Sequence, residues 1–119
     1  SAEDRTRQAA SSKITEYVSE RGCPDGLFCH NDEIAIGAYL GLSGLGIRIP
    51  ADTAIVGFDG IEDTECTKPA LSTVKVPVEE MCETAWKYLL NRIEHPNLPR
   101  QQSLVVPKLL VRESSVKNQ

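Results

Sequence analysis

Two polar residues of this chain directly follow short apolar runs, and both have side chains suited to hydrogen bonding. Asn31 follows the apolar run Leu27-Phe28-Cys29, and Asp59 follows the longer run 53–58. Both runs have the form of buried parallel strands, and ligands of open α/β sheets bind beyond the carboxyl ends of the strands. The sequence therefore predicts that Asn31 and Asp59 converge on one polar crevice.

The turn at Asn31 can also serve the structure alone. Asn31 and Asp32 directly precede a helical pattern, and the side-chain oxygens of Asn and Asp commonly cap the first turn of a helix. From the residues alone, ligand binding and helix capping both remain open here.

Catalytic and metal chemistry have little support in the residue pattern. Asp59 at a strand end has the position of a nucleophile or phosphoacceptor, but no activating base or metal cluster accompanies it. The cysteines form no C-x-x-C pair and stand at Cys23, Cys29, Cys66 and Cys82. Two of them, Cys29 and Cys82, lie in apolar patterns where a free thiol acts as a small hydrophobe. His30 and His95 have no cysteine at ligand spacing and are expected to face solvent. We predict no enzyme, metal or cofactor.

Composition narrows the class of protein. The 119 residues suit one domain, and 40% hydrophobic with 25% charged residues is typical of a globular protein. The net charge of −4 and the lack of a Lys/Arg cluster predict that this chain does not itself bind nucleic acid. No apolar run approaches the roughly 18 residues of a membrane span, and the N-terminus lacks the form of a signal peptide. We therefore expect a cytoplasmic protein without membrane contact.

Helical and strand patterns alternate along the chain. The capping-box form of Ser1 to Asp4 predicts a helix that Gly22 and Pro24 end. The elements expected after it are strand 26–30, helix 33–45, strand 53–58, loop 61–70, strand 71–76, helix 78–94, strand 104–111 and a frayed tail from Glu113. Pro107 indicates an edge strand or a bend. The order predicts an α/β fold with a mostly parallel sheet flanked by helices.

Glycines interrupt helix 33–45 at Gly37, Gly41 and Gly44. Each costs about 1 kcal/mol relative to alanine inside a helix, so three predict a close backbone approach, against the sheet or a second subunit. A start on a helix and a total of only four strands also suggest an excised piece of a larger domain.

Five motifs carry a family resemblance, in order and with natural spacing over nearly the whole chain. They are Asp25 to Gly37 (DGLFCHNDEIAIG), Gly44 to Asp52 (GLGIRIPAD), Ile55 to Asp59 (IVGFD), Pro69 to Val74 (PALSTV) and Leu110 to Ser115 (LVRESS). Together they resemble the effector-binding core of lactose/galactose-repressor family regulators.

The resemblance implies a partial periplasmic-binding-protein-like (type I) fold, in which two α/β subdomains close around a small molecule. Residues 1–119 would be a C-terminal fragment of the effector-binding domain. Residues 1–76 would form the C-terminal subdomain, residues 77–101 a helix and loop of the absent N-terminal subdomain, and residues 102–115 a returning strand. The family's helix-turn-helix and hinge helix would lie upstream of Ser1.

Carried over position by position, the resemblance gives Asn31 and Asp59 hydrogen bonds to the effector's hydroxyl groups, and it favours this role over capping for both. Asp32 is expected to hold the turn or to cap the helix. Val76 departs from the family pattern, because a polar residue often stands at that position.

Family members also pair through surfaces that match the start of the first helix, helix 33–45 and the loop around Cys66. The resemblance therefore implies an isologous homodimer. Its expected interface residues are Ser1, Ala2, Arg5, Ile36, Gly37 and Cys66. Helix 78–94, deprived of its subdomain, is expected to expose an apolar stripe and to dock on a partner chain or exchange between chains.

The function implied is the effector-sensing and dimerisation portion of a DNA-binding transcriptional regulator, expected to be a repressor. Its effector would be a sugar-like or nucleobase-like small molecule, and operator DNA would be bound only through the missing N-terminal domain. The alternative is a periplasmic-type sugar-binding protein of the same fold. Four unpaired cysteines would be unusual in that oxidising compartment.

Overall fold

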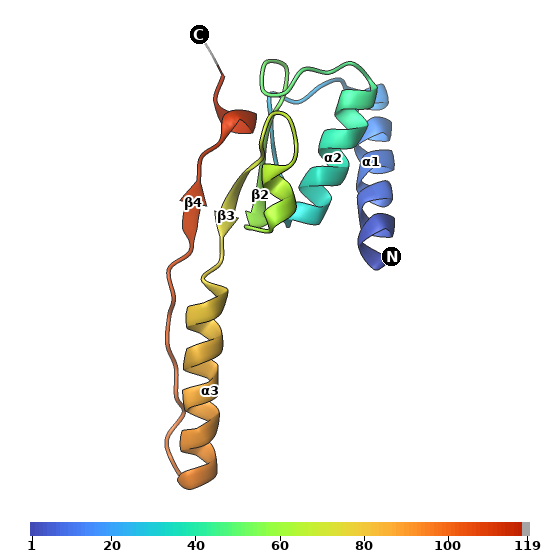
Figure 1. The fold of residues 1–119 in the computed structure, drawn as a ribbon. Coiled ribbons are helices and arrows are strands. Elements are labelled where there is room, and N and C mark those ends of the chain that lie inside the picture. Colours follow the sequence, from blue (N-terminus) through green and yellow to red (C-terminus); the bar gives the residue numbers. More distant parts are fainter. Residues whose placement is uncertain (118–119) are drawn as a thin grey trace. The chain divides into compact units, whose positions relative to one another are not determined.

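A computed structural model describes residues 1–117 and divides them into two units. Unit 1 comprises residues 1–75 and 109–117, and unit 2 comprises residues 76–108. The elements in chain order are α1 (Ala2–Arg21), β1 (Gly26–Phe28), α2 (Asp32–Gly44), β2 (Ala54–Asp59), the 3-10 helix η1 (Glu62–Glu65), β3 (Ser72–Lys75), α3 (Val78–Glu94), β4 (Lys108–Leu110) and the 3-10 helix η2 (Glu113–Ser115) (Figure 1).

The sheet has the strand order β1-β2-β3-β4, and its β1–β2 and β2–β3 pairs are parallel. Phe28 stands opposite Val56, and Gly57 stands opposite Thr73. The predicted α/β class with a mostly parallel sheet is confirmed. Within residues 1–117, no helix is long and apolar enough to cross a membrane.

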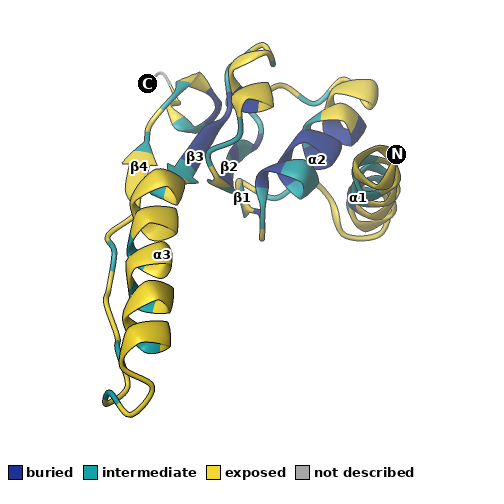
Figure 2. Ribbon diagram, turned by 60° about the horizontal axis from the view of Figure 1, so that its bottom comes forward, coloured by how far each residue is buried: buried dark blue, intermediate teal, exposed yellow. Residues whose placement is uncertain are grey.

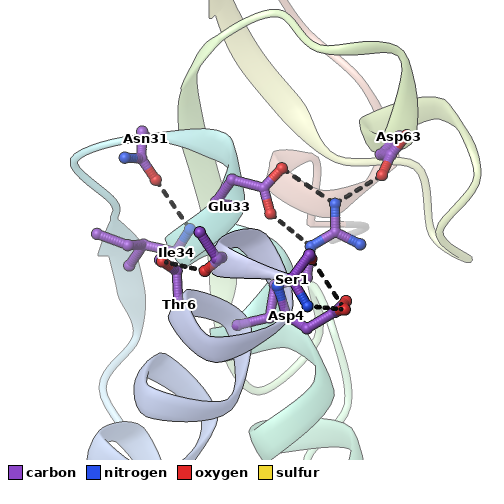
Figure 3. Close-up of polar contacts among 9 residues, drawn as sticks. Ser1, Asp4, Thr6, Asn31, Glu33, Ile34 and Asp63 are labelled. Atoms are coloured by element: carbon purple, nitrogen blue, oxygen red, sulfur yellow. Dashed lines mark hydrogen bonds and ion pairs between the residues drawn. The ribbon is translucent and has the colours of Figure 1, made fainter.

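The helix α1 begins with the predicted capping box. The Asp4 backbone N–H donates to Ser1 Oγ at 3.2 Å, and the Ser1 amino group donates to Asp4 Oδ2 at 3.0 Å (Figure 3). Gly22 follows the last helical residue at a φ of 84°, in the left-handed region that glycine tolerates. Both predicted ends of this helix are therefore confirmed.

The glycines of α2 lie against α1. A Cβ built on Gly37 would come within 2.7 Å of Ala10 Cβ, and one built on Gly41 would come within 2.7 Å of the Ser11 carbonyl oxygen. Gly44 has open space around it. The predicted close approach is confirmed for Gly37 and Gly41, but its partner is not the sheet or the second subunit that was expected. It occurs between two helices of one chain, because glycine at these two positions lets the helix backbones touch.

The core of unit 1 lies around α2, which packs on both α1 and β2 and is the most buried helix in Figure 2. The buried apolar residues are Ile14, Cys29, Ala35, Ile36, Ala38, Leu42, Ile55 and Leu71. Cys29 behaves as the small hydrophobe that was predicted. Burial, assisted by the nearby charge of Asp32, raises the pKa of its thiol to about 11.

Unit 2 consists of α3 and the chain that follows it. The helix has the predicted bounds, 78–94, but none of its residues is buried (Figure 2). Its exposed apolar side chains are Val78, Met81, Trp86, Leu89, Leu90 and Ile93. Cys82 is exposed too. The exposed apolar stripe that the sequence predicted for this helix is therefore present. His30 and His95 face solvent as predicted.

The last strand is much shorter than the predicted 104–111. β4 comprises only residues 108–110, after Pro107, and it lies at the sheet edge next to β3. Proline has no N–H to donate to a strand ladder, which agrees with an edge position. Upstream of it, the chain is tied to α3 instead, since Gln101 Nε2 donates to the Tyr88 carbonyl at 3.0 Å. The unit boundaries fall at 75/76 and 108/109. The assignment of residues 77–101 to another subdomain stays a prediction.

The tail from Glu113 was expected to fray, and for residues 113–117 this expectation is wrong. Asn118 and Gln119 lie outside the described residues. Ser114 is fully buried in η2, where its hydroxyl donates to the Ile55 carbonyl at 2.6 Å and accepts from the Ser72 N–H at 2.8 Å. The Arg112 guanidinium donates to Thr64 Oγ1 at 2.6 Å. Ser114 in the tail is therefore hydrogen-bonded to both β2 and β3, which no local pattern in its sequence indicates.

Candidate functional site

The turn between β1 and α2 positions Asn31. The Cys29 N–H donates to the Val56 carbonyl at 2.8 Å, which holds the chain beside β2 beyond the end of β1. Asn31 then adopts extended backbone angles and caps α2, its Oδ1 accepting from the Ile34 N–H at 2.9 Å (Figure 3). The capping role is thus realised. The cap uses only the Oδ1 atom of the half-buried side chain. The Nδ2 group has no hydrogen-bond partner within residues 1–117, so it remains available as a donor.

Asp59 ends β2 in an unusual backbone conformation. Its φ is 119°, the one positive φ among the non-glycine residues described. Side chains at such angles are strained by about 1–3 kcal/mol, and strain of this kind concentrates at functional sites. The side chain is exposed, and its carboxylate accepts no hydrogen bond from the described residues. It is therefore available as an acceptor for a bound molecule.

Asp32, unlike the neighbouring Asn31, is directed into the protein interior. It is fully buried, and its Oδ2 accepts from the backbone N–H groups of Gly60 at 2.7 Å and Ile61 at 2.9 Å. Its Oδ1 accepts from Thr73 Oγ1 at 2.6 Å. Of the two expected roles, holding a turn is confirmed, because Asn31 supplies the helix cap.

The structure places Asn31 and Asp59 at the same edge of the sheet. Each stands at the carboxyl end of its strand, β1 and β2 are parallel neighbours, and neither side chain is buried in the core. The sequence predicted both placements, and the convergence of the two side chains on one polar crevice stays a prediction. Val76 follows β3 directly and offers no side-chain hydrogen bond.

An ion-pair cluster beside this edge was not found from the sequence. Arg7 on α1 donates through Nε to Glu33 at 2.5 Å and through Nη2 to Asp63 at 2.6 Å (Figure 3). These two carboxylates hold the pKa of the guanidinium above its usual range. The cluster joins α1, the first turn of α2 and η1. Its members are separated by 26 and 56 residues, so no local spacing could have indicated it.

The residues expected at a dimer interface fall into two groups. Ser1, Ala2, Arg5 and Cys66 are exposed. Ile36 is only 4% exposed within the chain, and Gly37 is covered by α1, so these two have little surface left for a second copy. The neighbouring helix α1 fills the space beside Gly37. The place of all six residues in a dimer interface stays a prediction.

A separate groove of about 510 Å³ lies between α1 and β1. Its lining is mostly apolar and includes Ile14, Leu27 and Phe28. Asn31 and Asp59 do not line it, so it is distinct from the predicted polar site. In the part of the chain that the structure describes, no three His, Cys, Asp or Glu side chains gather as metal ligands.

Known proteins share both the sequence and the fold of this chain. Residues 1–115 match the family described as "Periplasmic binding protein-like domain". The HTH-type transcriptional repressor MelR of Bacillus subtilis (strain 168) is 44% identical over 101 residues, which are 85% of this chain and 29% of that protein. The chain thus spans less than a third of the length of this curated relative.

Two solved structures of LacI family transcriptional regulators have the same fold. The regulator from Arthrobacter sp. FB24, in complex with lactose, superposes with a TM-score of 0.84 at 31% identity, covering 92% of this chain and 41% of that one. The regulator from Enterococcus faecium, with bound ribose, superposes with a TM-score of 0.83 at 32% identity, covering 95% and 41%.

Proposed function

Because this chain belongs to the periplasmic binding protein-like domain family, in its lactose/galactose-repressor branch, we propose that it forms part of the effector-binding domain of a DNA-binding transcriptional repressor. The observation that carries the proposal is the pair Asn31 and Asp59 at one edge of the parallel sheet. Each keeps hydrogen-bonding atoms without a partner in the described residues. The effector is a sugar-like small molecule, with a nucleobase-like one as the second candidate.

The chemistry of the pair suits a sugar. A hydroxyl group both donates and accepts, so one sugar hydroxyl can accept from Asn31 Nδ2 while another donates to the Asp59 carboxylate. A hydrogen bond to a charged group contributes roughly 1.5–3 kcal/mol. The lactose and ribose bound to the two related regulators support this class of ligand.

Signal transfer follows from a difference in affinity. An effector that binds one arrangement of the intact domain more tightly than another shifts the equilibrium between them, and this shift changes DNA affinity. DNA is bound through another part of the protein, because this chain carries a net charge of −4 and no basic cluster. The protein acts in the cytoplasm, where operator DNA lies, and it is not an enzyme. The repressor relative MelR favours this function over that of a periplasmic sugar-binding protein.

The intact protein is a homodimer in this proposal. Arg5, with its neighbours Ser1 and Ala2, and Cys66 near η1 remain exposed for a partner copy. Arg5→Glu is expected to shift the sedimentation coefficient of the intact protein towards that of a monomer. Arg21→Glu, at the other exposed end of α1, is the matched control and leaves the coefficient unchanged. Equal behaviour of the two variants would contradict this interface.

Isothermal titration of the intact protein with D-ribose and lactose tests the ligand. Asp59→Asn is expected to weaken binding of the sugar that the wild type binds by tenfold or more, because a charge-assisted hydrogen bond is lost. Asp25→Asn is the control, because it makes the same change of charge at the amino end of β1, away from the strand ends that carry Asn31 and Asp59. It should leave the affinity unchanged. If both variants bind as the wild type does, Asp59 does not contact the effector.

A further inference from the structure

The buried carboxylate of Asp32 has more partners than its place in a helix requires. Asn31 already caps α2, yet Asp32 accepts three hydrogen bonds, all of them from residues outside that helix. Two of the donors, Gly60 and Ile61, follow Asp59 directly in the chain. The carboxylate therefore acts on the segment that leaves the candidate site.

The bond from Gly60 has a direct effect on Asp59. The Gly60 N–H belongs to the peptide unit that joins Asp59 to Gly60, so its 2.7 Å bond to Asp32 fixes the orientation of that unit. On its other side, Asp59 is registered opposite Lys75 in the β2–β3 pair. Asp59 is thus held between two anchored neighbours, and this accounts for the persistence of a φ of 119°.

Two glycines make this contact sterically feasible. A Cβ on Gly60, whose φ is 84°, would lie 2.8 Å from Lys75 Cγ and 2.9 Å from Lys75 Cα. A Cβ on Gly57 would lie 3.2 Å from Ala35 Cβ and would overlap Asp32 Oδ1. Only glycine therefore fits at position 57, where the Asp32 carboxylate approaches β2, and at position 60, where the turn approaches Lys75 of β3.

We propose that Asp32 is a positioning residue of the effector site, which holds Asp59 in the strained conformation that presents its carboxylate to the ligand. Asp32 itself is 0% exposed and does not touch the effector. The inference rests on the proposed function for the ligand contact of Asp59, but the hold on the turn is measurable without any ligand.

The chain provides an internal reference for such a measurement. It has two Asp-Gly pairs, Asp25-Gly26 and Asp59-Gly60. Labelling the intact protein with carbonyl-¹³C aspartate and ¹⁵N glycine restricts the NMR spectrum to amides of Asp-Gly pairs, and the Asp59→Asn variant assigns the Gly60 signal. In Asp32→Ala, the Gly60 amide is expected to shift and to exchange with solvent at least tenfold faster. Gly26 should stay unchanged.

Affinity is measured in the same variants with D-ribose and lactose. Asp32→Ala is expected to weaken binding on the order of tenfold, and Asp32→Asn, which keeps an acceptor for the Gly60 and Ile61 N–H groups, should restore most of it. Thr73→Val removes only the bond to Oδ1. It serves as a control for lost stability, because it leaves the turn held and should bind like the wild type. If Asp32→Ala does not fold, Asp32→Ser, whose side chain is too short to reach the turn, replaces it.

The outcomes separate the two claims. A wild-type protein that binds neither sugar contradicts the proposed sugar class, whereas an unchanged Gly60 signal in Asp32→Ala overturns the positioning role whatever the ligand. The positioning role also fails if Gly60 responds while affinity for a bound sugar does not. It fails again if Thr73→Val weakens binding as much as Asp32→Ala, since loss of stability would then explain both.

Discussion

Thr73 on β3 donates a 2.6 Å hydrogen bond to Asp32 at the start of α2, and β2 lies between β3 and β1, the strand that precedes α2 in the chain. Gly57 of β2 stands opposite Thr73 in register, and its missing side chain leaves the space through which the carboxylate reaches. Both partners are fully buried. One glycine thus lets a helix, a strand and the turn after Asp59 share a single carboxylate.

The first prediction concerns this space. Gly57→Ala is expected to lower the free energy of unfolding by roughly 2–4 kcal/mol, because the added methyl group overlaps Asp32 Oδ1 and leaves buried polar groups badly paired. Gly44→Ala, where a Cβ meets nothing within 4 Å, is the control and should raise stability by up to about 1 kcal/mol. Urea unfolding of the two variants, each made in the same protein, measures both changes in the free energy of unfolding. Similar changes in the two variants would contradict the packing described here.

A second prediction follows from the backbone of Asp59. Asp59→Gly is expected to raise the free energy of unfolding by about 1 kcal/mol or more, because glycine adopts a φ of 119° without strain. The same variant loses its carboxylate and should weaken sugar binding at least tenfold. Asp59→Ala loses the carboxylate but keeps the strain, so it should weaken binding without the gain in stability. A destabilised Asp59→Gly would show that the conformation is not strained.

A third prediction tests the ordered tail. Ser114→Ala removes the acceptor of the buried Ser72 N–H and should destabilise the chain by about 1–3 kcal/mol in urea unfolding. Ser12→Ala on the exposed face of α1 removes the same hydroxyl from a solvated position and should be neutral or slightly stabilising. Equal stability of both variants would mean that the tail contributes little to the fold.

The fourth prediction concerns pH. The pKa of the Cys29 thiol is raised from 9.0 to about 11 in the folded chain, so the unfolded chain releases this proton at lower pH. The resulting stability is fully present below pH 9 and is lost as pH rises through about 11. Wild type should therefore lose about 2 kcal/mol more than Cys29→Ala over this interval. The prediction is wrong if the urea midpoints of wild type and Cys29→Ala change with pH in the same way.

Local patterns predicted much of the secondary structure. The bounds of α3, the capping box of α1 and the glycine after it all depend on spacings of a few residues, which the chain shows directly. The positions of Asn31 and Asp59 at strand ends were predictable for the same reason. Each follows a short apolar run, and the order of elements makes those strands parallel neighbours.

Tertiary structure alone decided how distant residues pair. The partners of Arg7 are 26 and 56 residues away, Thr73 is 41 residues from Asp32, and Ser114 is 42 residues from Ser72. The same holds for Gly37, whose spacing indicated a close approach but not that α1 makes it. Periodicity reports which face of an element is apolar, whereas the atom that meets that face depends on how all elements pack. The sequence by itself therefore determined most of the elements and the two polar strand ends. The length of β4, the ordered tail and the hydrogen bonds of the buried Asp32 were decided only by packing.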